Sequence, residues 1–156
     1  MADAPARAAL WRTLGFNESV ITQFRASAGE FTSGPQAGRK LLLLTTVGAK
    51  SGTERIAPLI YSMAGDKYVI AASKGGAPKH PDWFLNLRAN PLVTVEVGAE
   101  RFTATATVAE PEEYRRALYD AHALPHPFFL DYEKKTTRRI PVVVLERTER
   151  TIPRSP

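Results

Sequence analysis

The chain has 156 residues, about the size of one domain, with 44% hydrophobic and 24% charged residues, so disordered and fibrous classes are excluded. It contains no cysteine, which excludes disulfides, thiolate zinc sites, iron–sulfur clusters and thiol nucleophiles, and favours a cytoplasmic protein. No apolar run approaches the ~18 residues of a transmembrane helix, and residues 1–15 lack the apolar segment of a secretory signal.

The net charge of +5 is concentrated in one third of the chain. Residues 37–90 contain eight basic and three acidic residues, whereas the other residues contain thirteen of each. A local positive field of this kind attracts an anion, which can be a phosphate, a polycarboxylate, a nucleic acid or an anionic membrane surface. Charge alone does not choose among these partners.

Apolar residues at helical spacing mark the N-terminal region. Two short amphipathic helices are predicted within residues 3–27, broken at Gly15, with Asn17 as the expected N-cap of the second. Residues 27–38 are rich in glycine, serine and proline, which indicates a linker. We therefore expect an N-terminal helical appendage with its linker over residues 1–37, a main domain over 38–150 and a short tail over 151–156.

The N-terminal helices carry Arg7, Arg12 and Arg25 beside their apolar residues. Three roles follow from this composition: packing against the main domain, covering the mouth of a binding site, or contact with an anionic membrane surface. The third role would place the protein peripherally at the inner face of the plasma membrane.

From residue 39 on, short β-rich runs alternate with turn residues. Strands are predicted over residues 40–47, 55–63, 67–73, 92–97, 101–109 and 140–148, and helices over 81–90 and 111–122. This order does not follow the β-α-β alternation of a parallel doubly wound sheet. The sequence therefore predicts a mainly β (α+β) fold, a small antiparallel barrel with helices covering its gaps.

Two glycine-bearing loops are candidate anion or ligand sites. The turn GAKSGTER (residues 48–55) does not have the spacing of a Walker motif, but its glycines, Lys50 and Arg55 can still cradle an anion. The loop SKGGAPK (73–79) follows a strand and precedes a helix, where bare backbone can meet a flat ligand or a phosphate. The alternatives are a solvated basic turn and a flexible surface loop.

Several chemistries lack the residues that they need. His80, His122 and His126 have neither cysteine nor a carboxylate cluster beside them, so we expect no metal site, and there is no G-x-S-x-G elbow for a hydrolase. Glu112 and Glu113 suit the first turn of a helix better than a glycosidase pair. A nucleic-acid-binding barrel stays open as an alternative, because the aromatic residues Tyr61, Tyr68, Trp83 and Phe84 lie in the basic third.

Three segments, in their order and spacing, resemble one known family. They are TTVGAKSGTERIAPLIY (45–61), ASKGGAPKHPDWFLNLRANP (72–91) and DYEKKTTRRIPVVVLER (131–147). From Gly38 to about Thr148 the chain resembles the actinobacterial deazaflavin-dependent nitroreductases. The resemblance implies a split β-barrel of about six antiparallel strands with short helices, related to flavin reductases and pyridoxamine-phosphate oxidases. It also implies that the cofactor is coenzyme F420, an 8-hydroxy-5-deazaflavin with a phosphodiester and an oligoglutamate tail.

The resemblance also implies a set of coenzyme-binding residues. Those expected around the phosphate are Lys50, Ser51 and Arg55, with Lys79 a further candidate for the tail. Those expected along the ring are Ala57, Pro58 and Ile60, followed by the strand end Ala71, Ala72, Ser73 and Lys74, whose backbone meets the ring edge. Ala49 and Ile56 are expected to bind the coenzyme as well. The helix expected to close over the ring supplies Asp82, Trp83, Phe84, Leu85 and Asn86.

The implied reaction is hydride transfer from C5 of the reduced coenzyme to a small-molecule acceptor, such as a quinone, an enone-type ring like a fused lactone or coumarin, or a nitroaromatic. The expected substrate wall consists of His126, Phe128, Phe129 and Tyr132. Because His126 and Phe129 stand where relatives can present tyrosines, we expect apolar planar acceptors to be favoured over nitroimidazoles. Candidate proton donors are Tyr61, Tyr132 and Ser73.

Two further interpretations remain beside this one. A split barrel of the same superfamily can use FMN, and a barrel can bind a cofactor without catalysis. We expect no nucleic-acid partner, and the sequence does not predict the oligomeric state.

Overall fold

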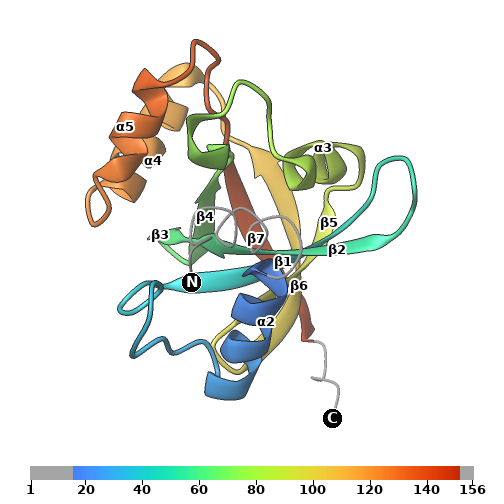
Figure 1. Cartoon of the computed structure of the whole chain (residues 1–156). Helices are drawn as coiled ribbons and strands as arrows, with labels where there is room; N and C mark the ends of the chain where they lie inside the picture. Colours follow the sequence, from blue (N-terminus) through green and yellow to red (C-terminus); the bar gives the residue numbers. More distant parts are fainter. Residues whose placement is uncertain (1–15, 152–156) are drawn as a thin grey trace.

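The computed structural model describes residues 16–151, and its centre is a single antiparallel sheet (Figure 1). Seven strands follow one another across the sheet in the order β2-β1-β5-β6-β7-β4-β3. The strands are β1 (Leu41–Val47), β2 (Glu54–Ile60), β3 (Ser62–Ala64), β4 (Lys67–Ala71), β5 (Leu92–Val97), β6 (Glu100–Val108) and β7 (Val142–Thr151).

The two edges of the sheet meet at Tyr61. The edge strands β2 and β3 are consecutive in the chain, and Tyr61 is the only residue between them, so the sheet curls until its edges join end to end. The predicted strand over residues 55–63 is therefore two strands, which makes seven where six were expected. Pro58 in β2 fits this edge position, because proline has no N–H group to donate to a second neighbouring strand.

Strand β1 is buried on both faces. Leu42 and Leu44 point into the barrel core together with Val95 and Phe102, while Leu41 and Leu43 belong to a separate cluster on the outside of the barrel. A strand that is covered on both faces reads as a continuous apolar run rather than as an alternation, which explains the four consecutive leucines.

Helix α2 (Phe16–Ser27) supplies the cover on the outer face of β1. Val20 and Phe24 are buried there, and Arg25 forms a two-bond ion pair with the buried carboxylate of Glu96, at 2.8 and 3.1 Å. The helix begins at Phe16, so the expected N-cap Asn17 lies within the first turn instead. The other predicted helix, with Leu10, Trp11 and Leu14, lies outside the described residues, and no helix of residues 16–151 is long and apolar enough to cross a membrane.

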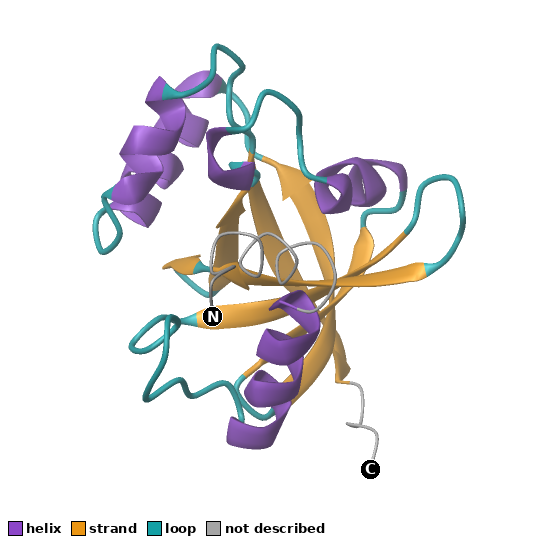
Figure 2. Cartoon of the chain, viewed as in Figure 1, coloured by secondary structure: helices purple, strands orange, loops and turns teal. Residues whose placement is uncertain are grey.

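The remaining helices lie on the outside of the barrel strands (Figure 2). They are the short 3-10 helix η2 (Lys74–Gly76), α3 (Asp82–Ala89), α4 (Glu112–Ala123) and α5 (Phe128–Lys134). Helices α3 and α4 agree with the prediction. Helix α5, in the segment expected to form the substrate wall, was not predicted as a helix; Pro127 precedes its first residue.

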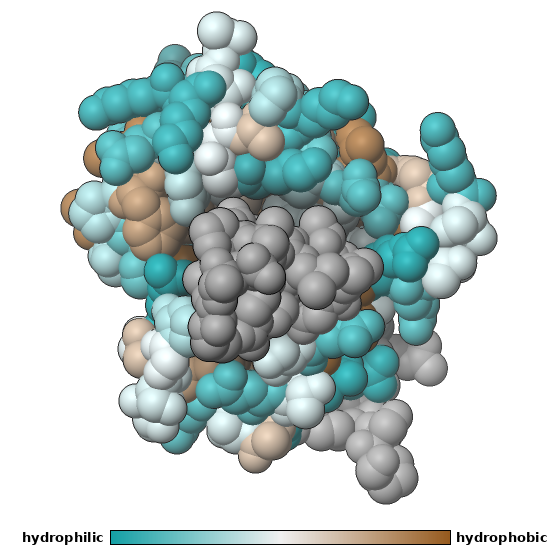
Figure 3. All heavy atoms as spheres, in the orientation of Figure 1, coloured by the Kyte–Doolittle hydropathy of each residue, from teal (hydrophilic) through white to brown (hydrophobic). Residues whose placement is uncertain are grey.

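Helices α4 and α5 pack together on a second apolar cluster outside the barrel, around Tyr119, Phe129 and Ile140. Figure 3 shows apolar side chains at the surface over this helix pair, on the left of the view. Leu124 is 80% exposed and Leu130 is 42% exposed, so one side of the pair is open to solvent.

Candidate functional site

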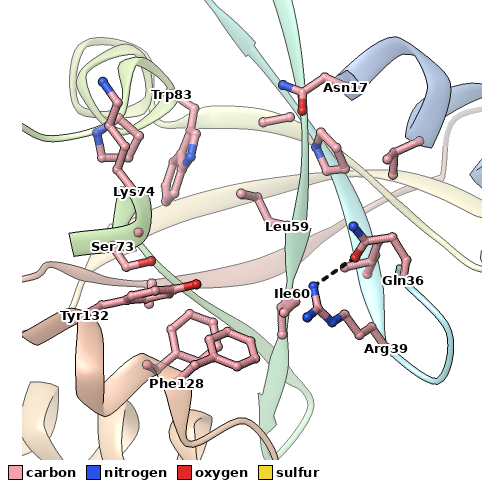
Figure 4. A pocket seen from close by; sticks show the side chains of 18 residues that line it. Asn17, Gln36, Arg39, Leu59, Ile60, Ser73, Lys74, Trp83, Phe128 and Tyr132 are labelled. Carbon is pink, nitrogen blue, oxygen red and sulfur yellow. Dashed lines mark hydrogen bonds between the residues drawn. The ribbon is translucent and has the colours of Figure 1, made fainter. Parts of the chain in front are cut away.

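Two adjoining pockets, of about 340 and 740 Å³, run along β2. Asn17, Ala57 and Trp83 line both pockets, so together they form one elongated cleft. We call the part beside the β1–β2 turn the hairpin pocket, with the turn residues Gly48 to Ser51, Arg55, Ile56, Asp82, Leu85 and Asn86 in its lining. We call the other part the α5 pocket, with Pro58, Leu59, Ile60, Ala71, Ser73, Lys74, Phe128, Phe129 and Tyr132 in its lining (Figure 4).

The β1–β2 turn is held in shape by its own hydrogen bonds and by α3. The Gly48 N–H donates to the Thr53 carbonyl at 2.8 Å, and a Cβ at Gly48 would lie 2.5 Å from the Ser51 hydroxyl, so a larger residue there would displace that hydroxyl. The buried Asn86 side chain accepts a bond from the Ala49 N–H at 3.0 Å and donates to the Thr46 hydroxyl at 3.2 Å. Asn86 therefore fastens α3 to the turn, and these bonds use its side-chain oxygen and one N–H of its amide.

Lys50 and Arg55 are the cations of the hairpin pocket. Both are exposed, and within residues 16–151 neither makes an ion pair or a hydrogen bond through its side chain. Glu18 and Asp82 also line this pocket, so the lining as a whole is not positively charged. The positive charge lies on the side of the β1–β2 turn. An anion is therefore expected on the side of the turn, away from α2 and the start of α3.

The α5 pocket is mostly apolar, with a few polar groups at its margins. Figure 4 shows the rings of Phe128 and Tyr132 along one side and the Gln36–Arg39 pair on another. Arg39 donates to Gln36 at 3.2 Å, and its guanidinium lies 5.3 Å from the centre of the Phe128 ring. A pocket with apolar walls and a few convergent polar groups is typical of sites for flat organic ligands.

The wall formed by α5 is backed by buried aromatic residues. Phe129 is 5% exposed, its ring centre lies 4.6 Å from that of His122, and its carbonyl accepts a hydrogen bond from the Tyr119 hydroxyl. His122 is buried, with its Nδ1 2.7 Å from the Ser62 hydroxyl, and burial lowers its pKa to about 4. The imidazole is therefore neutral near pH 7 and contributes packing rather than charge.

Helix α5 also touches the loop that follows β4. Gly76 has a φ of +83°, and a Cβ there would lie 2.8 Å from the Tyr132 carbonyl oxygen and 2.9 Å from Cβ of Lys135. Only glycine permits both this backbone and this approach. The loop carrying Ser73 and Lys74 is thus packed directly against the helix that carries the aromatic wall.

Most of the residues that the sequence nominates for a site line the cleft, but several do not. Ala72 is fully buried in the core, and Phe84 is buried with its ring against that of Trp83 on the same helix. Lys79 lies outside both pockets. Tyr61 packs edge-on against Tyr68 in the barrel and also lies outside the cleft.

His126 stacks near Phe128, with ring centres 5.4 Å apart, but does not line the α5 pocket. Sequence reasoning missed Asn17, Val20, Gln36, Arg39 and Leu59, which do line it. Asn17 and Val20 lie in the segment interpreted as a helical appendage, and Gln36 lies in its linker. Arg39 was counted only for its charge, and no sequence motif marks any of the four.

The cleft fits a long ligand with one anionic end and one flat end. Lys50, Arg55 and the Ser51 hydroxyl face one pocket, while Ala57, Pro58 and Trp83 provide flat apolar surface in the other. The N–H groups of Ser73 and Lys74 make no hydrogen bond within the described part of the chain, so the pocket margin offers unused donors. A deazaflavin with a phosphodiester tail has this distribution of charge and shape.

Comparisons with known proteins show the family of the chain. A family model described as F420H2-dependent quinone reductase matches residues 18–147. An F420H2-dependent quinone reductase of Mycobacterium tuberculosis is 44% identical over 108 residues, covering 68% of this chain and 72% of that protein. A solved F420-H2 dependent reductase matches with a TM-score of 0.63 at 42% identity, covering 69% of this chain and 95% of the other.

A more distant structure shows the fold alone. It is described as a pyridoxamine 5′-phosphate oxidase of Listeria innocua, and it matches with a TM-score of 0.52 at 11% identity, covering 88% of this chain and 98% of the other. The expected split-barrel class is confirmed.

Proposed function

Because the chain belongs to the F420H2-dependent quinone reductase family, an F420-dependent group of enzymes, we propose that it transfers a hydride from reduced coenzyme F420 to a planar electrophilic acceptor, with quinones favoured. The observation that carries this proposal is the continuity of the two pockets through Ala57 and Trp83. A single cleft of this kind can hold the coenzyme's anionic end, its ring and an acceptor in one line.

Each part of the cleft has a distinct task in this proposal. Lys50 and Arg55 hold the phosphate region by charge-assisted hydrogen bonds, and Trp83 with Ala57 flanks the ring. Bound reduced coenzyme supplies the hydride, and the protein needs no nucleophile of its own. The main contribution of the chain is to hold two flat molecules with their reacting atoms about 3–3.5 Å apart and to exclude water.

The acceptor is assigned to the space beside α5. Phe128 and Phe129 offer apolar ring surface and no hydroxyl, so a quinone or fused enone gains burial there, whereas a nitro group would lose hydrogen bonds to water. Among the three proton-donor candidates, Tyr132 and Ser73 line the pocket. Tyr61 lies outside it, and burial raises its pKa, so it is the weakest of the three.

Helix α2 is proposed to close the mouth of the cleft. Asn17 and Val20 line the α5 pocket while Phe24 anchors the helix on the barrel, which favours a cover over a membrane anchor. Co-sedimentation with anionic vesicles tests the membrane role directly. Protein that pellets with the vesicles at low salt would favour peripheral membrane contact instead.

The proposed function is tested by comparing donors with one acceptor. Under anaerobic conditions, the protein should oxidise reduced F420 with menadione at a saturable rate, and reduced FMN should be a poor donor. Fluorescence titration should show tighter binding of F420 than of FMN, with quenching of Trp83 in a protein whose Trp11 is replaced by phenylalanine. Equal or better turnover with FMN would favour the FMN alternative, and binding without turnover would indicate a cofactor-binding protein.

A further inference from the structure

Arg138 holds the backbone of the loop between β4 and α3. It lies in the segment between α5 and β7, and its guanidinium donates hydrogen bonds to the carbonyls of Ala72 at 3.1 Å, Ser73 at 2.8 Å and Ala77 at 2.9 Å. The guanidinium also lies 3.0 Å from Nδ1 of His80. One side chain thus contacts four groups, which are all separated from it by about sixty residues in sequence.

The loop that Arg138 holds has an unusual backbone. Lys74, Gly75 and Gly76 are consecutive residues with φ of +47°, +63° and +83°. A left-handed conformation costs a non-glycine residue about 1–2 kcal/mol, so Lys74 adopts it only because the surroundings impose it. Within the loop itself only two backbone hydrogen bonds oppose this cost, from Gly76 to the Ser73 carbonyl and from Ala77 to the Lys74 carbonyl.

The carbonyls bound by Arg138 determine where two N–H groups point. The only cis peptide bond in the described chain precedes Pro111, so the peptide groups joining residues 72–73 and 73–74 are trans. In a trans peptide the N–H points opposite to the C=O. The N–H groups of Ser73 and Lys74 therefore point away from Arg138, and these are the donors without a partner in residues 16–151.

We propose that Arg138 is a positioning residue that aims the Ser73 and Lys74 N–H groups at the edge of the coenzyme ring. Ser73 and Lys74 line the α5 pocket, whereas Arg138 lines neither pocket, so it would act on the ligand only through the loop. This inference rests on the proposed function, because it takes the ring to lie beside Ser73. The acceptors on the ligand are expected to be the carbonyl oxygens or ring nitrogens of the pyrimidine half of the deazaflavin.

The shape of the guanidinium is essential to this role. Its planar fork presents five N–H donors in fixed directions, and here the three nitrogens reach four separate acceptors. A lysine ammonium carries the same charge on one atom and cannot span the carbonyls of residues 72 and 77 together. The neutral form of His80 fits the same network, because burial and, to a smaller extent, the nearby Arg138 and Arg88 lower its pKa and leave Nδ1 able to accept.

Three variants test the proposal. Arg138→Lys keeps the positive charge without the planar guanidinium, and Arg138→Met keeps the chain length without the charge or the guanidinium. Arg139→Met is the matched control, since the Arg139 side chain is 68% exposed and its one ion pair within residues 16–151 is with Glu112 at 3.6 Å. We expect F420 affinity to fall about 10- to 100-fold in both Arg138 variants and to change less than about twofold in the control. Affinities are to be measured on folded protein, with the folded fraction taken from urea unfolding.

Amide NMR provides a readout that does not depend on activity. In the parent protein, addition of oxidised F420 should shift the Ser73 and Lys74 amide protons downfield as they gain an acceptor. In Arg138→Lys, which retains the charge near the loop, these shifts should shrink, while coenzyme-induced shifts at the Lys50 turn remain. Guanidinium ion added to an Arg138→Ala variant should restore part of the affinity, and methylammonium should not.

The outcomes separate this inference from the proposed function. If the parent binds F420 but its Ser73 and Lys74 amides do not shift, or if Arg138→Lys binds as the parent does, Arg138 does not position the donors. A loss of affinity in Arg138→Met that follows the folded fraction alone, with no rescue of Arg138→Ala by guanidinium, would assign Arg138 a purely structural role. If the parent itself fails to bind F420, the proposed function is wrong, whatever Arg138 does.

Discussion

Side chains around the cleft divide into those that fasten the walls and those that remain available to a ligand. Asn86 and Arg138 belong to the first group. Asn86 hydrogen-bonds to Ala49 and Thr46, and Arg138 hydrogen-bonds to carbonyls of the β4–α3 loop. Lys50 and Arg55 belong to the second, because neither is paired in the described part of the chain. This division predicts which substitutions should affect binding without affecting the fold.

Replacement of Arg55 should weaken coenzyme binding while leaving the protein folded. Arg55→Ala removes one charge-assisted contact to the phosphate region, worth about 1.5–3 kcal/mol, so the dissociation constant for F420 should rise roughly ten- to a hundredfold. Lys67→Ala is the matched control, because Lys67 is a surface cation paired with Glu146 at 3.5 Å and lies outside the cleft. Unchanged affinity in folded Arg55→Ala would remove Arg55 from the site.

Acid should destabilise the protein through His122. Its pKa is about 4 in the folded chain and 6.5 in its ordinary state, so between these values the unfolded chain binds the proton and the folded chain does not. The contribution of neutral His122 to the free energy of unfolding is therefore complete above pH 6.5. It is lost as the pH falls toward 4, which lowers the free energy of unfolding by about 3 kcal/mol.

Urea unfolding across that pH range measures the loss. A His122→Met variant should show a much flatter profile, whereas His126→Gln, which alters a more exposed imidazole, should retain most of the slope. An unchanged slope in His122→Met would show that another group is responsible.

Among the elements, η2 and α5 contact each other and together line the α5 pocket. Gly76→Ala would place a methyl group against the Tyr132 carbonyl in a backbone that already disfavours alanine, so it should cost about 2–4 kcal/mol of stability and weaken both coenzyme and acceptor binding. Gly75→Ala is the matched control. Gly75 has a similar φ of +63° but no atom within 4 Å of an added Cβ, so only a backbone cost of about 1 kcal/mol is expected there.

Thermal or urea unfolding of the two glycine variants decides this point. If both lose the same stability, η2 and α5 move apart freely, and the close approach has no energetic consequence.

Helix α5 should control the acceptor and not the coenzyme. Phe128→Ala removes apolar ring surface from the α5 pocket and should lower kcat/KM for menadione about tenfold, with F420 affinity unchanged. Leu130→Ala on the same helix is the control, because Leu130 does not line the pocket and is 42% exposed. A loss of F420 affinity in Phe128→Ala, or equal effects of both substitutions on kcat/KM, would place the acceptor elsewhere.

The sequence predicted those helices and strands whose signals lie within a few neighbouring residues. The four leucines of β1, the turn glycines and the prolines that open α3 and α4 all signal structure within a few residues, and their elements agree with the prediction. The break at Tyr61 and the helix α5 were missed, because closure of the barrel and packing on the Tyr119 cluster decide them. Arg138 gives no local signal at all, since its partners lie more than fifty residues away.

At the scale of the whole molecule, the barrel brings sequence-distant segments into one cleft. The positive charge of residues 37–90 had suggested an anion, and the fold brings two of its eight cations, Lys50 and Arg55, to one pocket beside the β1–β2 turn. Most of the residues expected around the phosphate and along the ring come to lie in adjoining pockets, Lys79 and Ala72 being exceptions, and the sequence-distant segment 124–132 contributes Phe128, Phe129 and Tyr132 to the same cleft. The family match names the donor, and the shape of the cleft is compatible with it.

The proposed function depends on direct hydride transfer between coenzyme and acceptor bound together in this cleft. Single-turnover oxidation of reduced F420 by menadione, with the coenzyme carrying either hydrogen or deuterium at C5, measures this step. We expect an enzyme-dependent oxidation that is clearly slower with deuterium and about tenfold slower again in Phe128→Ala. Absence of oxidation, or a rate that ignores both the isotope and Phe128, would contradict it.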